Sequence, residues 1–429
     1  MKTRLSFRLT SSFLGIFFLI CLASCSTVTP SSSAAAENRV VIGIERLLTP
    51  EFLPLIQGKR VAVLTNHTGV MPDKSHIVDV LAARADVKLV KIFSPEHGIR
   101  GEADTHVSDD VDRKTGLKAI SLYGQVRKPT PEILQDVDVI IFDIQDVGAR
   151  YYTYIATMNS VLEAAAENKK QMIVLDRPNP ITGAYVAGAV GQRAKQPVTG
   201  PNYLPITHGM TVGELARMFN GERAAKNFPQ AELTVVPMQH YARTQWFDQT
   251  GLPWIKPSPN MINLTTATVY PATCLLEGTN VSEGRGTMQP FERIGAPWID
   301  GKALAKQLNS YNLAGVTFAP IQFMPDSVVD GIRIYPPKFV GQTCYGAEMS
   351  VTDRTKFASA EASVYIIHAL HQLYPDQLEW KNSRMDGLWK TDTIRKRLQA
   401  GASPQSIVAT WGGELAYFNQ VRAKYLLYP

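Results

Sequence analysis

The spacing of apolar residues between positions 60 and 238 predicts a regular alternation of strands and helices. Mostly continuous apolar runs, typical of strands that are covered on both faces, occupy residues 61–66, 88–94, 138–144 and 171–176. Segments 75–86 and 152–170 lie between these runs and carry apolar residues three and four positions apart, as amphipathic helices do. A helix at 211–222 and a strand at 233–238 continue the alternation. The pattern predicts an α/β fold with a Rossmann-like layered parallel sheet.

The pattern changes after residue 238. Residues 247–261, "FDQTGLPWIKPSPNM", are rich in proline and have no regular period. A short strand at 316–323 and longer helices at 356–374 and 392–401 follow. We therefore predict two domains: a Rossmann-like catalytic domain over 41–238, and a second, smaller α+β domain over 239–429 that closes a cleft.

The first 40 residues are expected to lie outside both domains. An apolar stretch over 13–22 follows three basic residues, Lys2, Arg4 and Arg8. The next residues, "LASC" (22–25), resemble a bacterial lipobox, so 1–24 is predicted to be a lipoprotein signal peptide and Cys25 to be lipidated. The alternative is an ordinary cleaved signal peptide. Residues 25–40 would form a flexible tether, and Ser26 favours the outer membrane, with the protein facing the periplasm.

The net charge limits the kinds of partner that the mature chain can have, and its cysteine content limits the disulfide bonds. The formal net charge is +6, and residues 1–24 hold three positive and no negative charges, so +3 remains without them. This mild excess gives no case for nucleic acid as a partner. An exported compartment would permit a disulfide between Cys274 and Cys344, but the sequence favours two separate buried thiols.

Several strong catalytic motifs are absent from the sequence. No G-x-G-x-x-G follows a strand, and "GAPWIDGKA" (295–303) has one residue too many between its glycines for a phosphate-binding loop. No G-x-S-x-G, H-E-x-x-H or C-x-x-C motif occurs either. We therefore expect neither a cofactor nor a metal.

Polar and titratable residues cluster where the predicted strands end. The carboxyl ends of parallel strands meet at one edge of a sheet, where ligands bind. The candidates at this edge are Asn66, Glu96, His97, Arg100, Glu102, Asp143, Gln145, Arg150, Tyr154, Asn179 and His208. The second domain adds Glu277, Asn280, Glu283 and Arg285. Glycoside hydrolysis uses a carboxylic acid to protonate the leaving oxygen and usually a second carboxylate, and both kinds of candidate are present.

Each candidate also has a structural interpretation. Glu96 could cap the turn after its strand, and Asp143 could cap a helix that starts near Arg150. His97 could orient a neighbour rather than act as a base. The stretch from Glu277 to Arg285 could be a solvated loop of paired charges. Four residues of one loop could instead be metal ligands, namely His97, Glu102, Asp104 and His106.

Taken in order, several motifs resemble the bacterial exo-β-N-acetylmuramidase family, the NamZ-type glycoside hydrolases of peptidoglycan recycling. They are "TNHTG", "FSPEHGIRGEAD", "DIQDVGARYYTYI", "LDRPNP", "LPITHGMTVGELA" and "LLEGTNVSEGRGT". The resemblance runs from about residue 40 to the C-terminus. It implies removal of a terminal N-acetylmuramic acid (MurNAc) from the non-reducing end of peptidoglycan glycans or MurNAc-GlcNAc fragments, in a cleft between the two domains.

The resemblance makes Glu96 the leading candidate for the general acid, with His97 beside it. The second carboxylate could be Glu102, Asp143 or Glu277, and retention or inversion at the anomeric carbon stays open. MurNAc carries a lactyl carboxylate, which a guanidinium fork suits. Three arginines are candidates for that role, namely Arg100, Arg150 and Arg285.

Two other functions remain possible on the sequence alone. A lipoprotein with the same cleft could bind cell-wall sugars without hydrolysing them. A metal-dependent esterase could use His97, His106 and nearby acids. A muramidase would release product from the glycan, whereas the binding lipoprotein would not. The metal-dependent esterase would lose its activity when a chelator is added.

Overall fold

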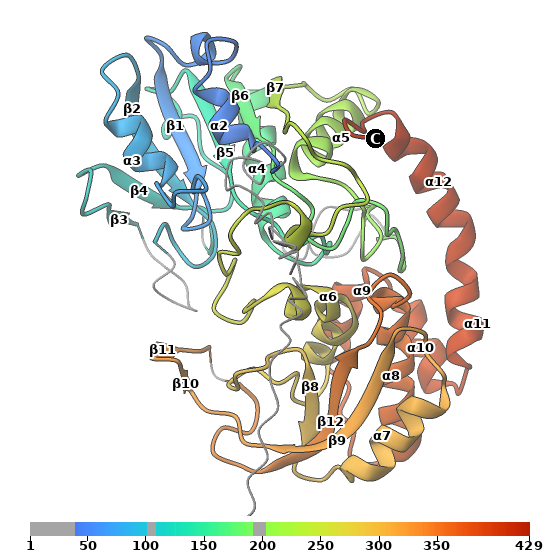
Figure 1. The fold of residues 1–429 in the computed structure, drawn as a ribbon. Coiled ribbons are helices and arrows are strands. Elements are labelled where there is room, and N and C mark those ends of the chain that lie inside the picture. The colour runs from blue at the N-terminus through green and yellow to red at the C-terminus, as the bar shows by residue number, and fades with distance from the viewer. Residues whose placement is uncertain (1–38, 101–108, 125, 192–202, 336) are drawn as a thin grey trace, which may run out of the picture. The chain divides into compact units, whose positions relative to one another are not determined.

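In the described part of the chain, a seven-stranded sheet forms the framework of the N-terminal half (Figure 1). The computed structural model describes residues 39–100, 109–124, 126–191, 203–335 and 337–429. The strands run in the order β3-β4-β2-β1-β5-β6-β7. Their bounds are β1 (Arg60–Thr65), β2 (Lys88–Ser94), β3 (Asp110–Val111), β4 (Lys118–Ser121), β5 (Val139–Asp143), β6 (Gln171–Leu175) and β7 (Glu232–Val236).

Six of these strands are parallel, and only β3 pairs antiparallel, with β4. Numbered among themselves, the six parallel strands have the order 3-2-1-4-5-6, which is that of the Rossmann fold. The predicted fold class is therefore confirmed. The order reverses between β1 and β5, and in such sheets the crevice for ligands lies beyond the carboxyl ends of the strands at this point.

Alternating residues of the strands bury both faces of this sheet. Leu64, Phe142 and Val174 belong to one hydrophobic core, whereas Val63 and Ile141 belong to another. The first core includes residues of α4 (Tyr154–Glu167) and α5 (Val212–Ala224), and the second includes residues of α2 (Gly43–Leu47) and α3 (Ile77–Ala82). Helices on both faces explain why the strands read as continuous apolar runs.

The C-terminal half contains a smaller antiparallel sheet in the order β8-β12-β9. Its strands are β8 (Arg293–Ala296), β9 (Val316–Phe323) and β12 (Cys344–Val351), and β10 (Val328–Val329) pairs with β11 (Ile332–Arg333) in a separate hairpin. Three helices pack with this sheet and with each other, namely α6 (Leu264–Thr273), α7 (Gly301–Ser310) and α8 (Ser359–Leu373). This part matches the predicted smaller α+β region.

The last helices lead the chain back to the large sheet. Figure 1 shows α12 running from the helices around the small sheet toward α5. There Tyr428 donates a 2.5 Å hydrogen bond to Oδ2 of Asp176, and the backbone N–H of Leu427 donates to Glu214. The C-terminal residues therefore pack on the N-terminal half. The remaining helices are α9 (Asn382–Trp389), α10 (Thr393–Gln399), α11 (Pro404–Val408), α12 (Gly412–Ala423), η1 (Leu53–Leu55), η3 (Phe247–Gln249), η4 (Cys274–Gly278) and η5 (Ala409–Trp411).

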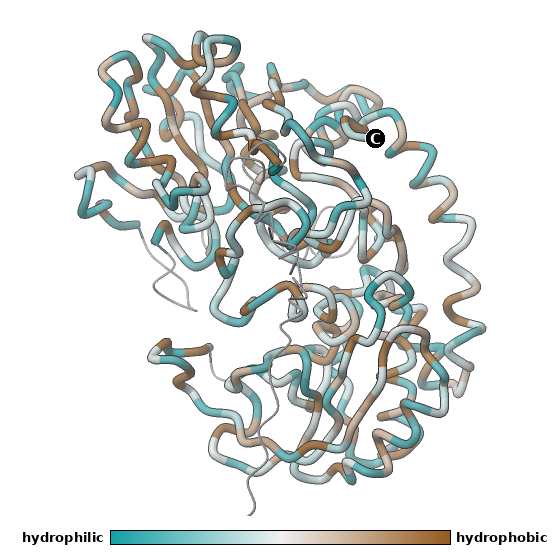
Figure 2. The backbone as a smooth tube through the Cα atoms, viewed as in Figure 1, coloured by the Kyte–Doolittle hydropathy of each residue, from teal (hydrophilic) through white to brown (hydrophobic). Residues whose placement is uncertain are grey.

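The hydropathy of the backbone follows the burial of these elements. In Figure 2, hydrophobic segments concentrate in the central strands and in the helices that cover them. Cys274 and Cys344 are both buried and both free, as the favoured interpretation of the sequence predicted. No helix within the described ranges combines the length and the apolar character that a membrane span requires.

Candidate active site

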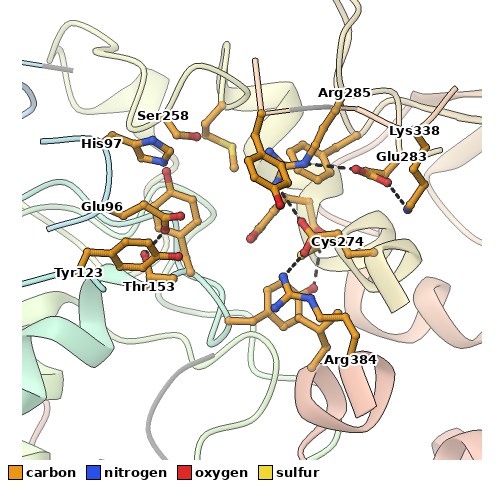
Figure 3. Close-up of a pocket in the computed structure, with 18 of the residues that line it drawn as sticks. Glu96, His97, Tyr123, Thr153, Ser258, Cys274, Glu283, Arg285, Lys338 and Arg384 are labelled. Atoms are coloured by element: carbon orange, nitrogen blue, oxygen red, sulfur yellow. Dashed lines mark hydrogen bonds and ion pairs between the residues drawn. The ribbon is translucent and has the colours of Figure 1, made fainter. Parts of the chain in front are cut away.

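A cavity of about 490 Å³ lies among the residues that follow several strands of the large sheet and a wall from the C-terminal half. Figure 3 shows Glu96, His97, Tyr123 and Thr153 on one side of it, and Glu283, Arg285, Lys338 and Arg384 on the other. This volume falls within the range of small-molecule sites.

The first wall is built at the carboxyl edge of the sheet. Glu96 and His97 follow β2, Tyr123 follows β4, and Thr153 lies between β5 and the start of α4. Strands β2, β4 and β5 run parallel, so their following loops meet at one edge. The convergence expected from the sequence therefore holds for Glu96 and His97.

Glu96 is held by neighbours from two other loops. The Thr153 hydroxyl donates a 2.7 Å hydrogen bond to Oε2 of Glu96. Tyr123 lies beside the same carboxyl group (Figure 3), and both burial and the Glu96 charge raise the pKa of the Tyr123 phenol. The carboxyl group is thus fixed at the cavity wall rather than used to cap its own turn.

His97 occupies an unusual backbone conformation. Its φ is +71°, in the left-handed region that non-glycine residues seldom adopt, and Gly98 follows with the same φ. The His97 side chain lines the cavity and is largely buried. Such strained residues gather at functional sites, because the surrounding structure must hold them in place. The turn encoded by "SPEHG" therefore presents two titratable side chains side by side.

The opposite wall carries a buried carboxylate between two guanidinium groups. Arg285 donates a 2.8 Å hydrogen bond to Oε1 of Glu277, and Arg384 donates to Oε2. Burial alone would raise the pKa of Glu277, but the two arginines outweigh it and lower the pKa. Glu277 is therefore ionised at neutral pH.

A second carboxylate extends this network. Glu283 accepts from Lys338 at 2.7 Å and lies 3.3 Å from Nε of Arg285. Lys338 also donates to the backbone oxygens of Leu276 and Val281. The segment from Glu277 to Arg285 is consequently a buried, cross-linked wall and not a solvated loop.

Other predicted residues lie outside the cavity lining, with their polar groups engaged elsewhere. Asp143 is fully buried and binds Arg177 through both oxygens, at 2.6 and 2.9 Å. Arg100 pairs with Asp79 and Asp112. These ion pairs hold loops at the edge of the sheet, and we assign them a structural role.

Three predicted amide residues also bind their own surroundings. Asn66 accepts from the backbone and hydroxyl of Thr68, as in a turn. Gln145 donates to the backbone oxygens of Asp146 and Pro178. Asn179 donates to the backbone oxygen of Met210. These contacts shape the loops behind the cavity wall.

Arg150 and Tyr154 join segments that are distant in the sequence. Arg150 is fully buried and donates to the backbone oxygens of Ala189, Leu204 and Leu388. Tyr154 donates to the backbone oxygen of Pro257. Tyr154 belongs to the hydrophobic core, and neither residue lines the cavity, although their neighbours Tyr151 to Thr153 do.

The last two predicted binding residues lie away from the cavity too. His208 is buried, and burial lowers its pKa to about 3, so it is neutral. Its Nδ1 accepts from the backbone of Met210. Asn280 bonds the backbone of Gln377 and Glu379. Glu102 and Cys25, by contrast, fall outside the described residues, so their predicted roles stay predictions.

Four residues of the cavity wall were not predicted from the sequence, namely Tyr123, Thr153, Lys338 and Arg384. Thr153 lies within a quoted motif, and Tyr123 follows β4, a four-residue strand too short to stand out by its apolar run. Arg384 is 107 positions from Glu277, and no local pattern connects the two. Only the packing of the chain reveals that pair.

The described residues give no arrangement of three histidine, cysteine, aspartate or glutamate side chains that could hold a metal ion. His106, Asp104 and Glu102, which the metal hypothesis needs, are outside the described ranges.

Comparisons with known proteins relate both halves of this chain to one family. The exo-β-N-acetylmuramidase NamZ N-terminal model matches residues 61–265, and the corresponding C-terminal model matches residues 268–428. The peptidoglycan β-N-acetylmuramidase NamZ of Bacillus subtilis (strain 168) is 42% identical over 421 residues, which cover 96% of this chain and 98% of that protein. The two matched regions meet between residues 265 and 268, and our boundary at 238 stays a prediction.

Two solved structures have the same fold. A DUF1343 family protein from Bacteroides fragilis NCTC 9343 matches with a TM-score of 0.81 and 35% identity, covering 91% of this chain and 100% of that chain. Another DUF1343 family protein from the same organism matches with a TM-score of 0.71 and 34% identity, covering 91% and 99%.

Proposed function

The chain belongs to the exo-β-N-acetylmuramidase NamZ family, and we propose that it removes terminal MurNAc from the non-reducing end of peptidoglycan glycans or MurNAc-GlcNAc fragments. It is thus a glycoside hydrolase. The match of the family models to both halves supports the activity. Within the structure, the main support is the Glu96 carboxyl group, which Thr153 fixes at the wall of a cavity of about 490 Å³.

Glu96 is the group best placed to donate a proton to the glycosidic oxygen. General acid catalysis requires a carboxyl group within hydrogen-bond reach of the leaving oxygen. Glu96 lines the cavity, and its hydrogen bond to Thr153 limits the rotation of its side chain. As the C–O bond breaks, the proton moves from Glu96 to the leaving sugar. Water then supplies the hydroxyl group at the anomeric carbon, and its remaining proton passes to a carboxylate of the site, so that the enzyme regains the proton it donated.

Of the three candidates for the second carboxylate, only Glu277 is among the described residues that line the cavity. Asp143 is bound by Arg177 and does not line the cavity, and Glu102 is outside the described residues. Glu277 does line the cavity but is engaged by two guanidinium groups. These positions favour Glu277 as a binding residue over Glu277 as a nucleophile or base.

The proposal is tested with the purified full-length chain and MurNAc-GlcNAc, followed by mass spectrometry. We expect free MurNAc and GlcNAc to appear, and no cleavage of glycans that carry GlcNAc at the non-reducing end. Binding of MurNAc-GlcNAc without product would instead support a non-catalytic sugar-binding protein. Chelator-sensitive hydrolysis of an ester substrate, with no release of MurNAc from the disaccharide, would support the metal-dependent esterase.

We also propose that Cys25 carries a lipid that anchors the protein to the cell envelope, facing the periplasm, in the outer membrane. The lipobox-like "LASC" and the Ser/Ala-rich segment after it support this. Cells fed a clickable palmitate should label the wild type but not Cys25→Ser, and fractionation should place the labelled protein with outer membranes. Equal labelling of both chains would contradict the anchor.

A further inference from the structure

The cavity lining carries more positive than negative side chains. Three acids line it, Glu96, Glu277 and Glu283, and four cationic side chains face them, Arg285, Lys338, Lys381 and Arg384. Since charges in a partly enclosed space interact more strongly than in water, this excess favours a ligand that carries a negative charge.

The cationic groups differ in how fully their donors are used. Lys338 has three N–H donors, and these reach Leu276, Val281 and Glu283. Arg285 is shared between two carboxylates and also lies 5.0 Å over the ring of Phe291. Both groups are committed to building the wall.

Arg384 is in a different position. It comes from α9, and its ion pair in the described structure is with Glu277 alone. A guanidinium has five N–H donors in a planar fork, so one carboxylate oxygen occupies only part of its capacity. The Arg384 side chain is 45% exposed, against 23% for Arg285 and 15% for Glu277. It is therefore the guanidinium that a ligand can reach most easily.

We propose that Arg384 binds a carboxylate on the substrate sugar and selects it over the neutral sugar, while Glu277 positions Arg384 for this contact. The inference rests on the proposed function, in which that carboxylate is the lactyl group of MurNAc. Glu277 bridges Arg285 and Arg384 through separate oxygens, so it holds both guanidinium groups at a fixed spacing. Arg384 is then a specificity-determining residue, supplied by the C-terminal half to a site whose acid comes from the N-terminal half.

The test compares two substrates that differ in the charge of the lactyl group. One is para-nitrophenyl β-MurNAc, and the other is its lactyl methyl ester, which is neutral and one methyl group larger. The full-length wild type should have a kcat/KM for the acid about 10- to 100-fold above that for the ester, the usual range for a hydrogen bond to a charged group. In Arg384→Gln this ratio should fall to near unity, because kcat/KM should decrease for the acid and change little for the ester.

Arg60→Gln is the matched control. Arg60 is 44% exposed and forms an ion pair with Asp138, and it lies at the N-terminal end of β1, away from the carboxyl edge where the cavity is. This variant should retain the preference for the acid. Arg384→Lys keeps the charge without the fork and should retain part of the preference. Equal losses on both substrates in Arg384→Gln, or a wild type that treats both alike, would overturn the inference while leaving the muramidase function intact. A wild type that cleaves neither substrate would overturn the proposed function itself.

Discussion

Thr153 donates a 2.7 Å hydrogen bond to Oε2 of Glu96, and so links two loops that lie 57 positions apart in the chain. Thr153 precedes α4, but its side chain does not cap that helix. The hydroxyl is thus available to the carboxyl group. This relationship fixes the proposed general acid relative to the sheet, and catalysis depends on such positioning.

Thr153→Val should lower kcat about tenfold or more, because an isosteric side chain without the hydroxyl leaves Glu96 less constrained. KM should change little, and the free energy of unfolding should stay within about 1 kcal/mol of the wild type. Steady-state kinetics and urea denaturation measure both. The exposed Thr317→Val serves as the control. An unchanged kcat would show that the hydrogen bond is not needed to position Glu96.

Glu277→Gln distinguishes a positioning role from a chemical one. If Glu277 only holds Arg285 and Arg384, the amide should raise KM for para-nitrophenyl β-MurNAc and keep kcat within about tenfold. If Glu277 were instead the nucleophile or the general base, the variant would lose far more in kcat. Removing the charge leaves Arg384 without its anionic partner and Arg285 with Glu283 alone, so we expect some loss of stability. A collapse of kcat with unchanged KM would make Glu277 the second catalytic carboxylate.

Asp146 should make the protein less stable as the pH rises from about 4 to about 7. It is buried with one carboxyl oxygen unpartnered in the described structure, and burial raises its pKa from 3.8 to about 7. Between these values the folded state keeps a proton that the unfolded state loses. Stability therefore falls with rising pH, by at most about 1.4 kcal/mol per pH unit.

Asp146→Asn removes this titration while keeping an acceptor for the Gly148 backbone N–H. The free energy of unfolding of the variant relative to the wild type should rise from pH 5 to pH 7 and level off above. Urea denaturation across this range measures it. A difference that does not vary with pH would show that Asp146 is ionised in the folded state throughout.

Tyr428 should stabilise the docking of the C-terminal residues on the large sheet. Its hydroxyl donates to Asp176 and accepts from the Met238 N–H. Tyr428→Phe removes both contacts but keeps the ring beside Tyr241, and should cost about 1–3 kcal/mol in unfolding free energy. Tyr417→Phe, at a 66% exposed position, should have no measurable effect. Equal unfolding midpoints for all three chains would contradict a stabilising role for this contact.

The framework of the large domain was predictable because local patterns determine it. The apolar run at 88–94 coincides with β2 to the residue, and in the smaller C-terminal sheet the short strand predicted at 316–323 coincides with β9. Helix 152–170 is observed as Tyr154–Glu167, shorter at both ends. Buried parallel strands need apolar side chains on both faces, and that requirement is visible in the sequence itself.

The site was only partly predictable, because its parts are brought together by packing. Five of the predicted residues line the cavity, namely Glu96, His97, Glu277, Glu283 and Arg285. Asp143 and Arg150 looked equally suitable in the sequence. In the structure, however, Asp143 pairs with an arginine, and Arg150 donates to three backbone oxygens. The sequence shows which side chains are titratable, but it does not show which hydrogen-bond or ion-pair partner each of them already has.

We propose that Glu96 protonates the leaving group of a MurNAc glycoside. The most direct test is release of para-nitrophenol from β-MurNAc and β-GlcNAc substrates by the wild type, Glu96→Gln and the exposed control Glu414→Gln. We predict release from the MurNAc substrate alone, lost in Glu96→Gln and retained in Glu414→Gln. Activity that survives in Glu96→Gln would contradict it and move the acid to another carboxylate of the cavity.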